Sequence, residues 1–139
     1  KAFGKWIAGD RTSGNLYQID ASTYTEDGTA LSFVAESIAM EAFPQRLRIP
    51  RCDFNFGMGV GTDAVPEPQV SVQWSDDGGH RWSDPVSRSL GENGRRKMQV
   101  RVNRMGLTGT KGRRFRLTID DPVYVALLAG SMEVEARKS

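Results

Sequence analysis

The stretch "VSVQWSDDGGHRWSDP", residues 70–85, carries the clearest structural signal in the sequence. In its first half the apolar residues Val70, Val72 and Trp74 are separated by polar ones. This period of two predicts a β-strand with one buried face. The pair Gly78–Gly79 allows a tight reversal after the strand, because glycine adopts a positive φ at little cost. We therefore expect a strand and the turn of an antiparallel hairpin.

The turn in this stretch resembles an Asp-box, a motif with the pattern Ser-x-Asp-x-Gly-x-Thr-Trp. The matching positions are Ser75, Asp77, Gly79 and Trp82, and Arg81 stands where threonine is usual. A short carboxylate such as that of Asp77 can accept hydrogen bonds from backbone N–H groups across a turn. Trp82 is expected to fold over the apolar side of the hairpin. Because Asp-boxes are structural and lie away from catalytic centres, we interpret this turn as a structural element.

The same alternation recurs along the chain. It is clear in residues 98–103 and 114–119, while residues 123–136 are more continuously apolar and predict a final strand or strand pair, with Met132, Val134 and Ala136 alternating near its end. The segments "GKWIAG" and "NLYQID" predict an opening hairpin. With about eight or nine strands at regular spacing, the chain is expected to be all-β, as an antiparallel β-sandwich or part of a propeller.

Two segments are less regular. Residues 30–43, "ALSFVAESIAMEAF", mix strand and helix formers, and we interpret them as mainly a strand that ends before Pro44. In residues 45–58 the apolar positions change from odd to even numbers near Pro50. A strand cannot change face without an inserted residue, so this slip predicts a β-bulge or bend at Pro50–Arg51.

Two regions are predicted. Residues 1–20 form the opening hairpin, and residues 30–139 form the sandwich domain that contains the Asp-box-like turn. Residues 21–28, "ASTYTEDG", are interpreted as a connector between them. Because the chain starts at Lys1 without a methionine, we expect it to be a piece of a longer protein.

The composition excludes several classes of protein. With 38% hydrophobic and 26% charged residues the chain has an ordinary globular composition, and its net charge of +2 does not by itself indicate a nucleic-acid partner. A single cysteine, Cys52, cannot form an internal disulfide. No apolar run approaches the ~18 residues that a membrane span needs.

No catalytic or metal site emerges from the sequence. His80 lies near Ser75 and Asp77, but residues crowded into one turn cannot serve as independently placed nucleophile, base and orienting group. The pairs Asp76–Asp77 and Asp120–Asp121 flank turns, and neighbouring strand residues point to opposite faces. One histidine and one cysteine far apart do not make a zinc site. We expect no enzyme, no cofactor and no metal.

The one strong charge asymmetry lies between Glu92 and Asp120, where nine Lys or Arg residues occur without an acid. If the strands predicted at 98–103 and 114–119 pair, they present one cationic face. That face could meet phosphate backbones, dock on an acidic neighbouring subunit, or simply be solvated. The candidate interaction residues are Arg95, Arg96, Lys97, Arg101, Arg104, Arg113, Arg114 and Arg116.

Several segments together resemble the C-terminal region of the packaged-DNA stabilisation proteins of short-tailed phages, which are tail hub or head-to-tail accessory proteins. The segments are "WIAGDRTSGNLYQID", "YTEDG", "VSVQWSDDGGHRWS", "RRKMQVRVNRMG" and "RRFRLTIDDPVYVALLAG". The resemblance implies a structural virion component, made in the host cytoplasm, that forms a homo-oligomeric ring below the portal. It implies portal and tail subunits as partners and a role in retaining packaged DNA. It also implies that the opening hairpin belongs to the last blade of an upstream propeller.

Two other classes of function remain open at this point. A carbohydrate-binding sandwich would need exposed aromatic platforms, for which Trp6 and Tyr17 are the candidates. A hydrolase of the propeller type is disfavoured, because its acid, base and nucleophile cannot be named.

Overall fold

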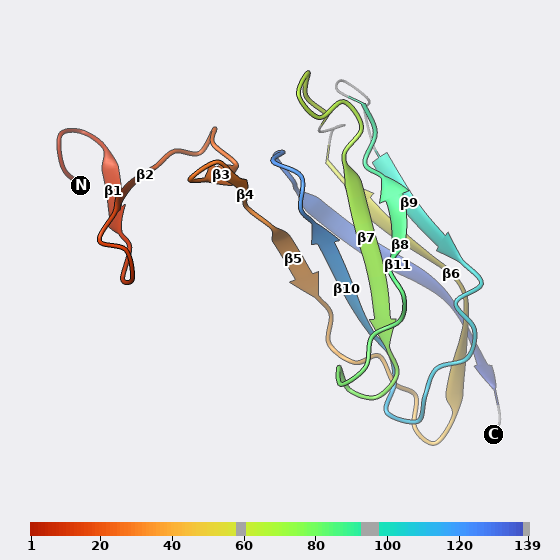
Figure 1. The fold of residues 1–139 in the computed structure, drawn as a ribbon. Helices are drawn as coiled ribbons and strands as arrows, with labels where there is room; N and C mark the ends of the chain where they lie inside the picture. Colours follow the sequence, from red (N-terminus) through yellow and green to blue (C-terminus); the bar gives the residue numbers. More distant parts are fainter. Residues whose placement is uncertain (58–60, 93–97, 138–139) are drawn as a thin grey trace.

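The computed structural model describes residues 1–57, 61–92 and 98–137, and all regular structure in them is β. A four-stranded sheet has the order β5-β10-β7-β8, and a three-stranded sheet has the order β11-β6-β9 (Figure 1). The first sheet consists of β5 (Phe33–Glu36), β10 (Arg114–Ile119), β7 (Gln69–Ser75) and β8 (Val86–Ser89). The second consists of β11 (Leu127–Arg137), β6 (Arg46–Phe56) and β9 (Met98–Asn103).

Every strand pair is antiparallel, and the two sheets enclose one apolar core. The rings of Phe54 on β6 and Phe115 on β10 meet edge to face at 6.0 Å between centroids, so these two strands lie opposite each other. Alternate residues of β7, β9 and β10 are buried, as their period of two predicts. Burying each Val or Phe side chain stabilises the fold by about 1.5–3 kcal/mol. The expected all-β antiparallel sandwich is confirmed, but in the described residues its two sheets contain seven strands, where about eight or nine were expected.

Strand β6 changes face at Ile49–Pro50. Between its consecutive pairs with β11, Glu133 with Arg51 and Glu135 with Arg48, β6 contains one residue more than β11 does. This extra residue is a β-bulge, and it keeps apolar side chains inward on both sides. The buried residues before and after it are Ile49, Cys52, Phe54 and Phe56. The predicted bulge is confirmed, centred one residue earlier than expected.

The strand expected across residues 30–43 is much shorter. Only β5, Phe33–Glu36, forms a ladder with β10. At the next residue, the side chain of Ser37 also bonds to β10. Its Oγ accepts the N–H of Phe115 at 2.9 Å and donates to the carbonyl oxygen of Ile38. Further along, one isolated bridge joins Met40 to Arg113, the residue before β10.

The connector expected at 21–28 contains strand structure. Strands β3 (Thr25–Glu26) and β4 (Thr29–Ala30) form a small hairpin. Its two turn residues, Asp27 and Gly28, have φ of 49° and 79°, as a type I′ turn requires. The Asp-Gly dipeptide is the sequence signal for this turn, and the prediction overlooked it.

The C-terminal apolar run forms one strand, β11, and it begins at Leu127. The alternation expected for Met132, Val134 and Ala136 places these residues on one face of β11, and Met132 packs against the core. Val134 and Ala136 are nevertheless exposed. The reason is position: β11 is an edge strand, and no other strand among the described residues covers its far side.

The opening hairpin is formed by β1 (Trp6–Gly9) and β2 (Leu16–Ile19). Among the described elements these two strands contact only each other, and they lie apart from the sandwich in Figure 1. The segment between the hairpin and the sandwich contacts the sandwich at Tyr24, whose ring lies 6.2 Å from that of Tyr124 between centroids. The division into residues 1–20 and 30–139 stays a prediction.

Candidate functional site

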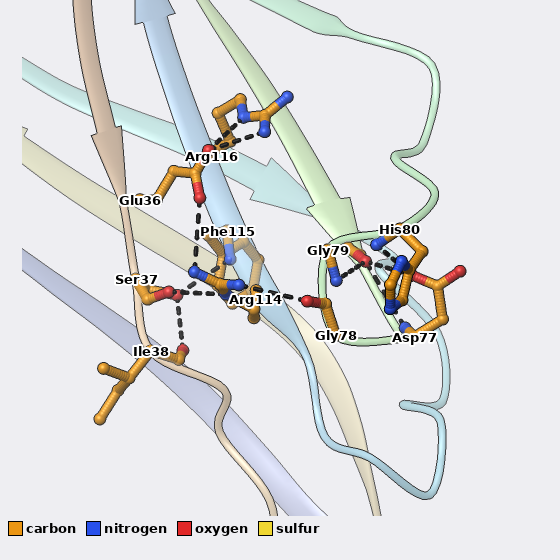
Figure 2. A network of polar contacts seen from close by, with 11 residues as sticks. Glu36, Ser37, Ile38, Asp77, Gly78, Gly79, His80, Arg114, Phe115 and Arg116 are labelled. Atoms are coloured by element: carbon orange, nitrogen blue, oxygen red, sulfur yellow. Dashed lines mark hydrogen bonds and ion pairs between the residues drawn. The ribbon is translucent and has the colours of Figure 1, made fainter.

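The turn after β7 is held by hydrogen bonds from two side chains. The hydroxyl of Ser75 accepts the N–H of Gly79 at 2.9 Å and donates to Asp77 Oδ1 at 2.8 Å. The same oxygen of Asp77 accepts the N–H of His80 at 3.0 Å (Figure 2) and the N–H of Arg81 at 2.9 Å. The hydrogen bond from the Arg81 N–H is the main reason why the pKa of the Asp77 carboxyl is lowered. This carboxylate is engaged in holding the turn.

Gly79 is required by the shape of the turn. Its φ is +100°, a backbone conformation that residues with a side chain rarely adopt. A Cβ there would lie 3.1 Å from Nη1 of Arg114 and 3.7 Å from the ring of Trp82. The side chains of Arg114 and Trp82 therefore close over the turn where Gly79 leaves room.

Trp82 is half-buried and packs differently from the expectation. The guanidinium of Arg116 lies over its ring, with 3.8 Å from Cζ to the ring centroid. Trp82 is not among the side chains that fill or border the core. It therefore covers the outer face of the four-stranded sheet, beside Arg116.

Arg114 connects the turn to the edge strand β5. It donates to the carbonyl oxygen of Gly78 at 3.2 Å and to that of Ser37 at 3.2 Å (Figure 2). Glu36 lies between Arg114 and Arg116, with N–O distances of 3.4 and 2.7 Å. The turn, β10 and β5 are thus joined by one polar network.

Arg113 and Asp76 form a second contact that the sequence reasoning missed. Nε and Nη2 of Arg113 donate to the two carboxylate oxygens of Asp76, each at 2.7 Å. The Arg113 side chain is only 2% exposed, and it also donates to the carbonyl oxygens of Met105 and Leu107. A signal was present: Arg113 is in phase with Phe115, so the period of two places it on the core face.

The candidate basic residues do not share one face. Strand β9 pairs with β6, whereas β10 lies between β5 and β7, so Arg101 belongs to one sheet and Arg114 and Arg116 to the other. The single cationic face was expected only if these two strands pair, and they do not, because alternation identifies a strand's face and not its neighbour. Arg113 is buried, and Arg104 is exposed at a turn with φ of 59°. Arg95, Arg96 and Lys97 lie outside the described residues.

Three of these arginines are paired with acids on their own sheet. Arg101 donates to Asp53 at 2.7 Å, and this hydrogen bond raises the pKa of Arg101. Arg51 reaches the other oxygen of Asp53 at 3.1 Å. Arg114 and Arg116 share Glu36, as described above. These acids partly cancel the positive field that the basic run alone would produce.

The remaining candidates have no catalytic geometry. His80 is exposed, and burial raises the pKa of the Cys52 thiol to about 11, which keeps it protonated at neutral pH. Trp6 is exposed, and Tyr17 is half-buried on the same hairpin. Within the described ranges, no group of three or more His, Cys, Asp or Glu side chains could hold a metal ion. The same residues contain no helix that is long and apolar enough to cross a membrane.

The fold and the site define a class of protein: a structural β-sandwich domain whose polar side chains stabilise its own turns and sheets. A family model described as bacteriophage P22 Gp10, beta-sandwich, matches residues 36–135, and the chain belongs to this family. It is accordingly a structural component of a phage virion, of the tail or head–tail accessory kind. A search of curated proteins found no match. The family suggests a protein that is not an enzyme, and it gives the carbohydrate-binding alternative no support.

Proposed function

We propose that the chain is an assembly module of a tail hub or head–tail connector, which forms a ring below the portal and helps to retain packaged DNA. The observation that carries the proposal is the family match over residues 36–135. The rigid, internally bonded sandwich supports a mechanical role. The ring, the portal contact and the retention of DNA come from the resemblance of the sequence to packaged-DNA stabilisation proteins.

The arrangement of charges favours docking on protein subunits over contact with DNA. A surface that binds phosphates needs arginines free to replace counterions. On the described strands, Arg101 is engaged by Asp53, and Arg114 and Arg116 by Glu36. A non-specific DNA contact by the basic run stays a prediction. If it exists, binding of duplex DNA falls steeply with salt.

The resemblance also leads us to propose that the hairpin of residues 1–20 completes the last blade of a propeller. Its exposed apolar residues fit this placement, since Trp6, Leu16 and Ile19 are 63%, 75% and 62% exposed. A two-stranded hairpin is marginally stable alone. In a protein that includes the propeller, backbone amides of β1 and β2 exchange more slowly than in this chain.

The role in DNA retention is tested with virions assembled without the protein. We expect such particles to package DNA and then to lose it, because the channel below the portal is not closed. The measurement is the DNA content of purified particles over time, with addition of the purified chain as the rescue arm. Particles that keep their DNA without the protein would rule out this role.

A further inference from the structure

Strand β11 has the longest free edge in the described part of the sandwich. It spans Leu127–Arg137 and pairs on one side only, with β6. At the opposite side of the molecule, β8 and β9 approach each other, and Arg88 Nε donates to the carbonyl oxygen of Arg101 on β9 at 3.1 Å. A long strand edge with unpaired N–H and C=O groups is a template for another strand.

An apolar cavity of about 200 Å³ lies between this edge strand and β5 of the other sheet. We call it the β5–β11 slot; it is lined by Ala35, Glu36, Ser37, Phe54, Phe115, Leu117, Leu127 and Gly130. Gly130 has no side chain over the Phe54 ring, since a Cβ there would lie 3.4 Å from the ring. A dry cavity of about 150 Å³ can hold a benzene ring, so the slot has room for one small apolar side chain.

Val134 is the side chain that fits the slot. Met132 packs against the core, so the period of two places Gly130, Met132 and Val134 on the inner face of β11. Val134 is nevertheless 47% exposed, because no neighbouring strand covers it. Strand β11 thus carries an exposed apolar side chain, Val134, and four residues before it Gly130 borders the apolar β5–β11 slot.

We propose that two copies of this chain pair through antiparallel β11 strands, with the two-fold axis at Met132. This register places Val134 of each copy opposite Gly130 of the other, at the slot. It also places Glu133 opposite Ser131. A two-fold axis at residue 133 or 135 would place Glu133 or Glu135 opposite its own copy, and an axis at residue 134 would place Glu133 opposite Glu135. Like charges directly opposite each other on paired strands are destabilising.

The pairing does not rest on the proposed role below the portal. A two-fold contact uses the same surface on both partners, whereas a cyclic ring needs heterologous contacts. The pair is therefore the form of free subunits outside a ring. The edge contact alone is small, which makes the association weak and concentration-dependent.

Sedimentation equilibrium of the full chain, without portal, up to about 1 mM tests the pairing. We expect a monomer–dimer equilibrium that Val134→Lys weakens at least about tenfold, because the charge would be buried in the slot. The matched control is Val34→Lys, which changes a valine that is 55% exposed on β5, and it leaves the equilibrium unchanged. Thermal melting confirms that both variants are folded.

The register is tested at Ser131. Ser131→Lys would face Glu133 of the second copy at both symmetry-related positions and tighten the pair, while Ser131→Glu would loosen it, each by about threefold or more. A wild-type chain that stays monomeric overturns the proposal. So does a self-association that Val134→Lys and Val34→Lys affect equally, which would indicate another surface, such as the β1–β2 hairpin. Neither outcome bears on ring formation with portal.

Discussion

At the scale of single residues, the sandwich depends on polar side chains that the core encloses or the turns require. The clearest case is Arg113, a cation that is 2% exposed and bound by both oxygens of Asp76. Satisfying a buried guanidinium needs several acceptors in fixed positions. Asp76 and the carbonyl groups of Met105 and Leu107 provide them. The adjacent aspartates of the sequence thus have different tasks, since Asp77 holds the turn.

Asp76→Ala is predicted to lower the free energy of unfolding by about 3 kcal/mol, because it leaves a buried charge without its partner. The matched control is Glu36→Ala, which breaks ion pairs that are about one-third exposed on each side and costs less than ~1 kcal/mol. Urea unfolding followed by tryptophan fluorescence measures both. Equal losses of unfolding free energy in the two variants would contradict the view that Asp76 compensates a buried charge.

Alanine substitutions at the adjacent glycines Gly78 and Gly79 distinguish two sources of instability, which are backbone strain and crowding by a side chain. Gly78 and Gly79 both have positive φ, 85° and 100°, so an alanine at either position is strained by about 1–2 kcal/mol. A Cβ at Gly78 meets nothing within 4 Å, whereas one at Gly79 meets Arg114. Gly79→Ala is therefore predicted to destabilise the protein more than Gly78→Ala in thermal melts. Equal losses would show that Arg114 moves away freely, and a larger loss for Gly78→Ala would contradict the role of crowding.

The Asp77 carboxyl gives the turn a dependence on pH. Its pKa is lowered in the folded state, so its contribution to stability is fully present above the unfolded pKa of about 3.9. The contribution is lost as the pH falls from there through the lower, folded pKa. Asp77→Asn removes this titration, and the acid side of its stability curve is predicted to be flatter than that of the wild type between about pH 2 and 5. Parallel curves for the two proteins would contradict the role of the carboxylate.

At the scale of elements, the alternation of apolar and polar residues predicted the strands and their buried faces well, because every second side chain of a strand points to the same face. It also predicted the bulge near Pro50. It did not predict which strands are neighbours, since β9 and β10 lie in different sheets although both alternate Arg with apolar residues. The salt bridges to Asp53 and Glu36 follow from that arrangement and could not be foreseen. Nor could the exposure of Val134, which depends on β11 being an edge strand.

The bulge leads to a prediction for β6. Deleting Pro50 removes the extra residue and leaves Ile49, now 0% exposed, two positions before Cys52, so both side chains still point inward in a regular strand. The deletion is therefore predicted to stay within about 1 kcal/mol of the stability of Pro50→Ala, which keeps the residue count. Urea unfolding compares the two variants, and a deletion that costs about 2–5 kcal/mol more would show that the bulge itself is required.

At the scale of the whole molecule, residues 36–135 define a phage β-sandwich domain, and the hairpin before it has apolar residues that need a partner. The described residues offer polar networks that hold the sandwich rigid and two surfaces for other proteins: the β11 edge and the hairpin. The sequence could indicate the family through its motifs. The surfaces became visible only once the sheet order was known, because a free edge is defined by which strands are absent beside it.

We propose that this chain is a structural part of the virion below the portal. A cryo-electron microscopy map of purified virions tests it most directly. We expect repeated copies of a sandwich with a four-stranded and a three-stranded sheet, arranged around the channel axis beneath the portal. A well-resolved tail in which no density fits this sandwich would contradict it.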